Sequence, residues 1–280
     1  MKKTYLNLGC GSRWHPDWVN IDIAPRDPAV IRHDLSRGIP LADESCDVVY
    51  HAAVLEHLRR QEAAALLSEC YRVMKPGGIL RVGVPDLEKI CRLYLLKLSE
   101  ALEGDGAAVH DYDWIMLELL DQVARERSGG DMLDYLRQDP LPNERFVYER
   151  IGVEGEELVE ALRASGASQN SPPFLCRLRR IPAFVKQNMV SWLSGIKGRR
   201  AYKIGRFRLT GEAHHWMYDR YSLARLLRLA GFIDPQLRDA HTSGIPDWDS
   251  FHLDTLPDGR VIKPDLFFME VIKPGESIDD

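Results

Sequence analysis

In the first ninety residues, short apolar runs typical of strands alternate with glycine-rich turns and with a segment whose apolar residues have helical spacing. This alternation is the feature of the sequence that constrains the fold most. The apolar runs lie at residues 5–8, 19–23, around 31, 47–50 and 79–84. Between the last two runs, residues 61–74 place apolar side chains at helical spacing, and Pro76-Gly77-Gly78 ends that helix. Strands separated by crossovers predict a mainly parallel sheet that is covered on both faces.

The same pattern returns near the end of the chain. Residues 221–230 have the apolar spacing of a helix, and residues 235–240 and 265–272 read as strands. Pro257-Asp258-Gly259 forms a turn between these two strands. We therefore expect the last two strands to pair antiparallel at the edge of the sheet.

A long segment interrupts this scheme. Residues 97–209 lack the strand pattern; their first half looks helical and acidic, and residues 177–208 carry ten basic residues and no acidic one. An insertion placed before the last helix of the sheet would lie over the carboxyl ends of the strands, where open α/β sheets bind ligands. We expect a helical lid or substrate insertion at 97–209, with residues 1–96 and 210–280 forming the main domain.

Charge and composition exclude several classes of protein. The 280 residues carry a formal net charge of −5, which argues against a generally basic nucleic-acid binder. No apolar run approaches the roughly 18 residues of a membrane span, and no signal peptide is expected. The five cysteines are scattered without a C-x-x-C pair, which favours reduced thiols in a cytoplasmic protein over a disulfide scaffold or a cysteine zinc site.

Three strand ends carry residues suited to a nucleoside cofactor. Gly9 and Gly11 follow the first apolar run and leave room for close approach to the backbone. Asp22 ends the second run and can accept hydrogen bonds from two ribose hydroxyls. Asp34 could accept from an adenine amino group. Trp14 stands where a dinucleotide fingerprint needs its third glycine, so NAD and FAD are disfavoured.

Together these segments resemble the class I S-adenosylmethionine-dependent methyltransferases. Residues 6–11 look like the family's first motif, residues 20–22 like its ribose-binding acidic position, and residues 34–35 like its adenine-side motif. Similarity to the later motifs lies in residues 47–58, 66–84 and 211–232. The shortened first crossover resembles a bacterial subgroup, methyltransferase type 11-like, associated with glycan and surface-polysaccharide modification.

The resemblance implies a Rossmann-like, doubly wound α/β fold. It has a mainly parallel seven-stranded sheet, an antiparallel edge strand and here a large helical insertion. The cofactor implied is S-adenosylmethionine. The residues expected to bind it are Asn7, Gly9, Cys10, Gly11, Asp22, Ile23, Asp34, Leu35 and His51.

Methyl transfer to a hydroxyl group benefits from a base near the operating pH. The candidates are His57, Asp86, His214 and His215, because they follow strand ends or lie where the insertion returns to the sheet. Glu56, Gln122 and Arg125 are the candidates for acceptor binding. Helix capping and packing is the alternative for Glu56-His57, and an exposed ion pair with Asp121 is the alternative for Arg125. Adjacent histidines point in different directions on a helix, so no metal is expected.

The expected function is methylation of a glycan or surface-polysaccharide precursor at an oxygen atom. Methylation of a small metabolite or lipid is one alternative, and a non-catalytic cofactor-binding regulator is another. The basic segment 177–208 suggests peripheral contact with an anionic membrane surface at the inner face, with a packed lid helix as the alternative. Nucleic acid is disfavoured as a partner, and the sequence does not define the oligomeric state.

Overall fold

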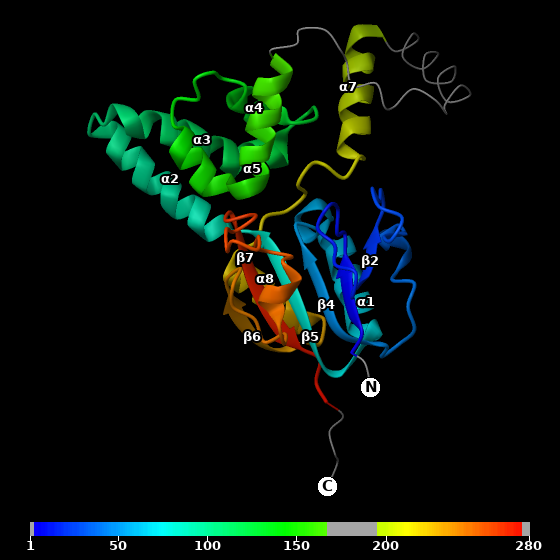
Figure 1. The fold of residues 1–280 in the computed structure, drawn as a ribbon. Coiled ribbons are helices and arrows are strands. Elements are labelled where there is room, and N and C mark those ends of the chain that lie inside the picture. The colour runs from blue at the N-terminus through cyan, green and yellow to red at the C-terminus, as the bar shows by residue number, and fades with distance from the viewer. Residues whose placement is uncertain (1–2, 167–194, 276–280) are drawn as a thin grey trace.

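A seven-stranded sheet forms the centre of the molecule (Figure 1). The structure is a computed structural model that describes residues 3–166 and 195–275. The strand order is β3-β2-β1-β4-β5-β7-β6; the pairs from β3 to β5 are parallel, and β7 is antiparallel to β5 and β6. The strands are β1 (Tyr5–Leu8), β2 (Val19–Asp22), β3 (Ile31–Arg32), β4 (Cys46–Ala52), β5 (Met74–Pro85), β6 (Ile233–Arg238) and β7 (Leu266–Ile272). The predicted Rossmann-like sheet is confirmed, with its antiparallel strand next to the outermost strand β6.

The order of the strands fixes where a ligand can bind. β2 and β3 extend the sheet to one side of β1, and β4 and β5 extend it to the other side. The connection from β1 to β2 contains no helix, as the short spacing predicts. The order in which successive strands are added to the sheet reverses between β1 and β4. Open α/β sheets bind ligands at such a point, outside the carboxyl ends of the strands.

Helices cover one face of the sheet. α1 (Arg60–Val73) and α8 (Arg220–Leu229) bury one apolar side each against the strands. In α1 the buried positions include Leu66, Cys70 and Val73, three and four residues apart, which is the spacing of one helix face. The predicted helix at 61–74 is thus present and contributes to the main core.

Aromatic side chains from the connection after β6 cover the other face. Trp248 from the 3-10 helix η3 (Trp248–Phe251) packs with Trp18 and Tyr50. Beside them, the fully buried Arg81 pairs with Asp254 and Glu270, each at 2.9 Å. A buried pair of this kind is costly to break, because an unpaired charge would remain in the interior. The second face is therefore held by a polar network beneath aromatic rings, rather than by helices.

A helical layer lies above the carboxyl ends of the strands (Figure 1). It comprises α2 (Leu87–Leu102), α3 (Gly106–Ala124), α4 (Gly130–Leu136) and α5 (Glu144–Gly166). α2 begins directly after β5 and runs through position 97, and the layer has its own apolar core around Trp114 and Val147. The basic helix α7 (Gly195–Arg208) follows, and residues 177–194 of the predicted basic segment lie outside the described residues.

No helix within residues 3–166 and 195–275 combines the length and the apolar character needed to cross a membrane.

Candidate active site

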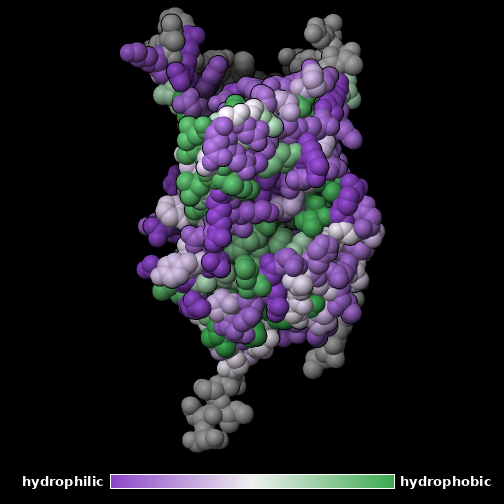
Figure 2. Space-filling view, turned by 90° about the vertical axis from the view of Figure 1, so that its left-hand side faces the viewer, coloured by the Kyte–Doolittle hydropathy of each residue, from purple (hydrophilic) through white to green (hydrophobic). Residues whose placement is uncertain are grey.

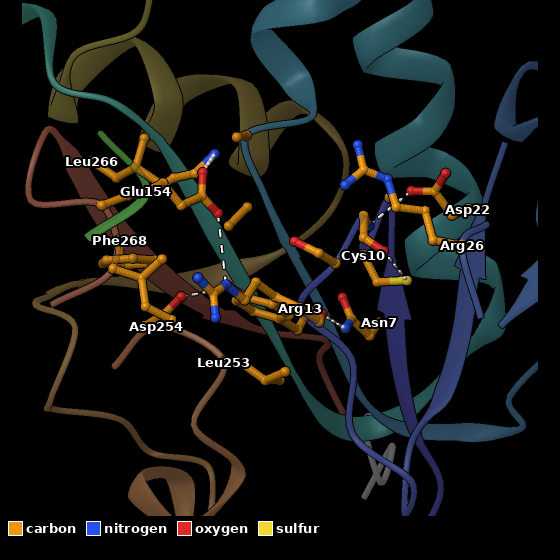
Figure 3. Close-up of a pocket in the computed structure, with 18 of the residues that line it drawn as sticks. Asn7, Cys10, Arg13, Asp22, Arg26, Glu154, Leu253, Asp254, Leu266 and Phe268 are labelled. Carbon is orange, nitrogen blue, oxygen red and sulfur yellow. Dashed lines mark hydrogen bonds and ion pairs between the residues drawn. The ribbon is translucent and has the colours of Figure 1, made fainter. Parts of the chain in front are cut away.

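A cavity of about 380 Å³ opens at the carboxyl ends of β1, β2 and β4 (Figure 3). Asn7, Cys10 and Asp22 lie on one side of it, and Glu154, Leu266 and Phe268 lie on the other (Figure 3). Its remaining lining residues are Gly9, Gly11, Ser12, Arg13, Ala24, Arg26, Tyr50, Ala52, Ala53, Leu253, Asp254, Ile262 and Lys263. The cavity thus lies at the point where the strand order reverses.

Gly9 and Gly11 shape the floor of this cavity. Both have left-handed backbone angles, with φ of +62° at Gly9 and +53° at Gly11, which favour glycine. A Cβ atom on Gly9 would lie 2.6 Å from Cγ2 of Val54, whereas one on Gly11 would meet no atom within 4 Å. Gly9 is therefore required for packing against the segment after β4, and Gly11 is required for its backbone angle alone.

Asp22 is fixed at the edge of the cavity by two backbone groups. The Gly11 N–H donates to its Oδ2 at 2.9 Å, and the Ala24 N–H donates to its Oδ1 at 2.7 Å. An ionised carboxylate has about four acceptor positions, so each oxygen can accept a further hydrogen bond. Asp22 is thus oriented and still able to accept from two vicinal hydroxyls.

Two other predicted residues support the same loop. Asn7 is buried, and its Nδ2 donates to the Arg13 carbonyl at 3.0 Å and to Oδ1 of Asn20 at 3.2 Å. Cys10 lines the cavity, and burial, together with the nearby Asp22 carboxylate, raises the pKa of its thiol to about 11. Cys10 therefore remains a neutral thiol at physiological pH rather than a nucleophile.

The residues predicted on the adenine side do not line this cavity. Ile23 is 63% exposed. Asp34 caps the 3-10 helix η1 (Leu35–Arg37), and hydrogen bonds from the Ser36 side chain and then from the Ser36 N–H lower the pKa of its carboxyl group. Leu35 packs at the margin of the main core. Their contact with an adenine ring remains a prediction.

His51 also lies apart from the lining residues. Its neighbours Tyr50 and Ala52 line the cavity, and alternation along β4 turns the His51 side chain to the opposite face. Its ring is fully buried, and neither nitrogen has a hydrogen-bond partner among the described residues. Burial lowers its pKa to about 4, so the ring is neutral at pH 7.

A second group of polar side chains forms directly beyond β4. We call Glu56, His57 and His214 the Glu–His–His cluster; the ligand atoms of the three residues lie within 4.8 Å of one another. Glu56 and His57 belong to the 3-10 helix η2 (Leu55–His57), and His214 belongs to the segment that returns from α7 to α8. The two imidazole rings meet edge to face, with their centroids 4.7 Å apart.

Backbone hydrogen bonds bring His214 to this position. The His214 N–H donates to the carbonyl of Gln122 in α3 at 2.9 Å, and the His215 N–H donates to the carbonyl of Glu56 at 2.7 Å. The segment therefore joins the helical layer to the end of β4. Of the two adjacent histidines, only His214 enters the cluster, and His215 is partly exposed.

Burial determines the protonation of the cluster. It raises the pKa of Glu56 to about 8 and lowers the pKa of His57 to about 4 and of His214 to about 3. At pH 7 the carboxyl group is protonated and both imidazoles are neutral. Both oxygens of Glu56 and Nδ1 of each histidine lack a hydrogen-bond partner among the described residues.

The other predicted residues have structural partners. Asp86 caps α2 by accepting from the Lys89 N–H at 2.9 Å. It lines a different cavity, of about 690 Å³, between α2 and the strands β6 and β7; Figure 2 shows this face hollowed between the helical layer and the sheet. Arg125 is paired with Asp121 at 2.5 Å and with Glu212 at 3.3 Å, and the side chains of Arg125 and Asp121 are buried. The ion pair with Asp121 is thus internal rather than exposed.

Sequence reasoning did not identify the basic and acidic residues on the far side of the cavity. Lys263 pairs with Glu154 of α5 at 3.2 Å, and both residues line the cavity. Arg13 lies 3.7 Å from Glu154, and its Nε has no hydrogen-bond partner among the described residues. Arg13 follows the glycine loop directly, which is a local signal. Glu154 and Lys263 reach the site only through the tertiary fold.

Comparison with known proteins finds a family match for the first part of the chain. Residues 6–82, which contain β1 to β4 and most of β5, match the family described as "Methyltransferase domain". This part of the chain is therefore similar to a methyltransferase domain, and S-adenosylmethionine is the cofactor that this similarity implies.

One curated relative matches part of the chain, and solved structures align with it at low similarity. A probable S-adenosylmethionine-dependent methyltransferase of Mycolicibacterium smegmatis is 36% identical over 99 residues, which are 29% of this chain and 37% of that protein. A methyltransferase structure from Methanosarcina mazei is 15% identical, covering 99% of this chain and 95% of that chain with a TM-score of 0.38. One from Archaeoglobus fulgidus is 10% identical, covering 97% and 86%, also with a TM-score of 0.38. TM-scores below 0.5 do not establish a shared fold. The description of the fold therefore depends on the strand order of the sheet alone.

Proposed function

We propose that this protein transfers a methyl group from S-adenosylmethionine to a hydroxyl group of a glycan or surface-polysaccharide precursor. The observation that carries the proposal is the hydrogen bond from Gly11 to Asp22, which fixes a carboxylate at the cavity where the strand order reverses. A ribose carries two vicinal hydroxyl groups that can donate hydrogen bonds to such a carboxylate. The matching methyltransferase domain supports the assignment of the donor.

The residues of the cavity fit this donor. Asp22 would accept from the ribose, and the bare backbone of Gly9 and Gly11 would allow close approach. Arg13, whose Nε lacks a hydrogen-bond partner among the described residues, would bind the carboxylate of the amino-acid part. When bound, S-adenosylmethionine supplies an activated methyl group on a positively charged sulfur. Holding the acceptor in line with it provides most of the rate enhancement, with effective molarities of about 10⁵ M or more.

The acceptor would lie between the cavity and the helical layer. Ala53 lines the cavity, and the Glu–His–His cluster begins three residues further along the chain. The unpaired polar atoms of the cluster favour an acceptor with hydroxyl groups over an apolar one. Gln122 and Arg125 lie beside His214 and remain our candidates for contacting a sugar.

The candidate bases that would accept the proton of the hydroxyl group lie in and beside the Glu–His–His cluster. His57 and His214 are neutral at pH 7, but their lowered pKa values make them weak bases. Asp86 is engaged as a helix cap. Replacing His214 and His215 singly with alanine tests the assignment, and full activity in both variants would remove these two residues as bases.

We further propose that the basic segment 177–208 contacts an anionic surface, which would place the protein at the inner face of the membrane. In α7, the exposed Lys197, Lys203 and Arg206 carry this charge, and the helix contains no acidic residue. Each basic residue near an anionic bilayer contributes about 1 kcal/mol. Deleting residues 177–208 should abolish sedimentation with vesicles rich in anionic lipid, and unchanged sedimentation would refute the contact.

Calorimetry and turnover together test the enzymatic proposal. Purified protein should release heat with S-adenosylhomocysteine at one site per chain, and absence of heat would refute the donor site. Incubation with S-adenosylmethionine and an extracted glycan fraction should yield S-adenosylhomocysteine. Turnover only with a lipid or small-metabolite fraction would refute the glycan assignment, and binding without any turnover would refute the enzyme.

A further inference from the structure

The Glu–His–His cluster has the composition of a metal site. Two imidazole nitrogens and one carboxylate are the protein ligands of several catalytic zinc and iron centres, which leave further positions open for water or substrate. In this protein Glu56 and His214 are 1% and 4% exposed, and His57, which is half-buried, lies beside them. Nothing in their sequence spacing indicates this, because His214 comes from a distant segment.

The free atoms of the cluster point to an absent ligand. Both oxygens of Glu56, Nδ1 of His57 and Nδ1 of His214 lack a hydrogen-bond partner among the described residues. Leaving one buried polar atom unsatisfied costs about 1–3 kcal/mol, and here four such atoms occur together. A single divalent cation accepts electron pairs from all three side chains and removes most of that cost.

The spacing suits a cation after small adjustments. The ligand atoms lie within 4.8 Å of one another. A zinc ion about 2.0–2.2 Å from each ligand would hold the ligand atoms about 3.3–3.6 Å apart in a tetrahedron. Side-chain rotations that move each ligand atom by about 1 Å close the difference. The surrounding backbone holds the cluster, because the His214 and His215 N–H groups are bonded to Gln122 and Glu56.

The charges around the cluster are balanced. Lys263 acts electrostatically on Glu56, His57 and His214 and would oppose a cation. However, Lys263 is paired with Glu154 at 3.2 Å and interacts with Asp265. Arg125, the other cation that acts on both histidines, is paired with Asp121 and Glu212. With these two cations paired, the Glu56 carboxyl group would release its proton as the metal binds and would then supply the local negative charge.

We propose that Glu56, His57 and His214 bind one divalent transition-metal cation, of which zinc and manganese are the leading candidates. The next step rests on the proposed function: the hydroxyl oxygen of the acceptor would bind at an open coordination position of the metal. That oxygen would lose its proton to solvent and form a bond to the methyl carbon as the carbon–sulfur bond breaks. The electron pair of that bond would remain on the sulfur. A bound cation makes the first of these steps easier by lowering the pKa of the oxygen it holds.

Metal content and cobalt spectroscopy test the site without measuring activity. The full chain is treated with a chelator, dialysed, and titrated with Zn²⁺, Mn²⁺ or Co²⁺ by calorimetry, and the Co²⁺ form is recorded by visible absorption. We expect one equivalent to bind, with ligand-field bands typical of a four- or five-coordinate site. No binding tighter than about 1 mM for all three cations would overturn the proposal.

Single variants separate this site from surface binding. His214→Ala and His57→Ala should each lose the single equivalent, and Glu56→Gln should weaken binding at least tenfold. His215→Ala is the matched control, because it removes the adjacent histidine outside the cluster, and should retain the full equivalent. Metal binding that persists in all three cluster variants would overturn the assignment.

Folding and donor binding are measured on the same samples. Circular dichroism excludes loss by misfolding, and Glu56→Gln preserves the shape of the side chain if an alanine variant fails to fold. Calorimetry with S-adenosylhomocysteine on the metal-free protein reports the donor site separately. Donor binding without metal binding would refute the metal site alone, and the reverse result would refute the proposed function alone.

Discussion

The donor cavity and the Glu–His–His cluster are neighbours, but the chain builds them in opposite ways. The donor side of the cavity comes from one short stretch, in which Gly11 reaches Asp22 through a single hydrogen bond. The cluster needs two segments that are distant in the sequence and that meet through the backbone hydrogen bonds of His214 and His215. The proposed cofactor site is therefore encoded in local sequence, whereas the proposed acceptor site depends on tertiary structure.

The largest expected effect is a loss of folding stability when Gly9, on the donor side of the cavity, is replaced. Gly9→Ala adds a methyl group 2.6 Å from Val54 in a left-handed backbone conformation, so it should lower the free energy of unfolding by about 2–4 kcal/mol. Gly11→Ala meets no atom within 4 Å and should cost about 1 kcal/mol, from the backbone angle alone. Urea denaturation measures both values, and equal losses would contradict the packing role of Gly9.

The next effect concerns donor affinity. Asp22→Ala removes a carboxylate that accepts charge-assisted hydrogen bonds, so it should raise the dissociation constant of S-adenosylhomocysteine about 10- to 100-fold. Asp27→Ala is the matched control, because Asp27 also accepts from a nearby backbone N–H but lies outside the cavity. Calorimetry should show less than a threefold change for the control. Cation binding to the cluster should be the same in both variants, and its loss in Asp22→Ala alone would contradict the separation of the two regions.

A pH effect of about 2 kcal/mol should mark the cluster. Glu56 keeps its proton in the folded protein up to a pKa of about 8, but in the unfolded chain it releases the proton near 4.5. Its contribution to stability is therefore complete below pH 4.5 and falls as the pH rises through 8. The buried rings of His51, His57 and His214 act in the opposite direction, because they release their protons near pH 6.5 in the unfolded chain but are neutral in the folded protein. Measured as the difference from a variant without the Glu56 carboxyl group, the metal-free protein should therefore lose about 1 kcal/mol per pH unit between pH 6.5 and 8.

Glu56→Gln sharpens that measurement. Glutamine does not titrate, so chemical denaturation of the metal-free variant between pH 6.5 and 8 should show a slope of the free energy of unfolding that is about 1 kcal/mol per pH unit more positive than that of the unchanged protein. A slope equal to that of the unchanged protein would assign the effect to another group.

The smallest effect concerns the adenine side of the donor site. Asp34→Ala removes the cap of η1 and the predicted contact with the adenine amino group, so donor affinity should fall about fivefold. Ser36→Ala is the control, because it keeps the Ser36 N–H that Asp34 caps and leaves the carboxylate in place. Calorimetry compares the two, and an unchanged affinity in Asp34→Ala would refute the predicted adenine contact.

The sequence predicted the sheet because its signals are local. Apolar runs, the glycine stop after β1 and the Pro-Asp-Gly turn each act within a few residues, and they define the strands and the carboxylate of Asp22. The same signals could not show that aromatic residues such as Trp248, rather than helices, cover one face. They also could not show that Lys263 and Glu154 meet at the cavity, because no periodic pattern records contacts between distant segments.

His57 and His214 illustrate the same limit at single residues. Each was identified as a candidate from its place after a strand or at the end of the insertion. Their edge-to-face contact and their shared position with Glu56 depend on backbone bonds that the fold supplies.

The two separate apolar cores have a consequence for how such a scaffold can diversify. Among the described residues, no side chain of α2, α3, α4 or α5 belongs to the core of the sheet, and the helical layer packs around residues of its own. Substitutions in that layer can reshape the space offered to an acceptor while the donor half keeps its packing. One sheet can thus serve chemically different acceptors by exchanging the module above it.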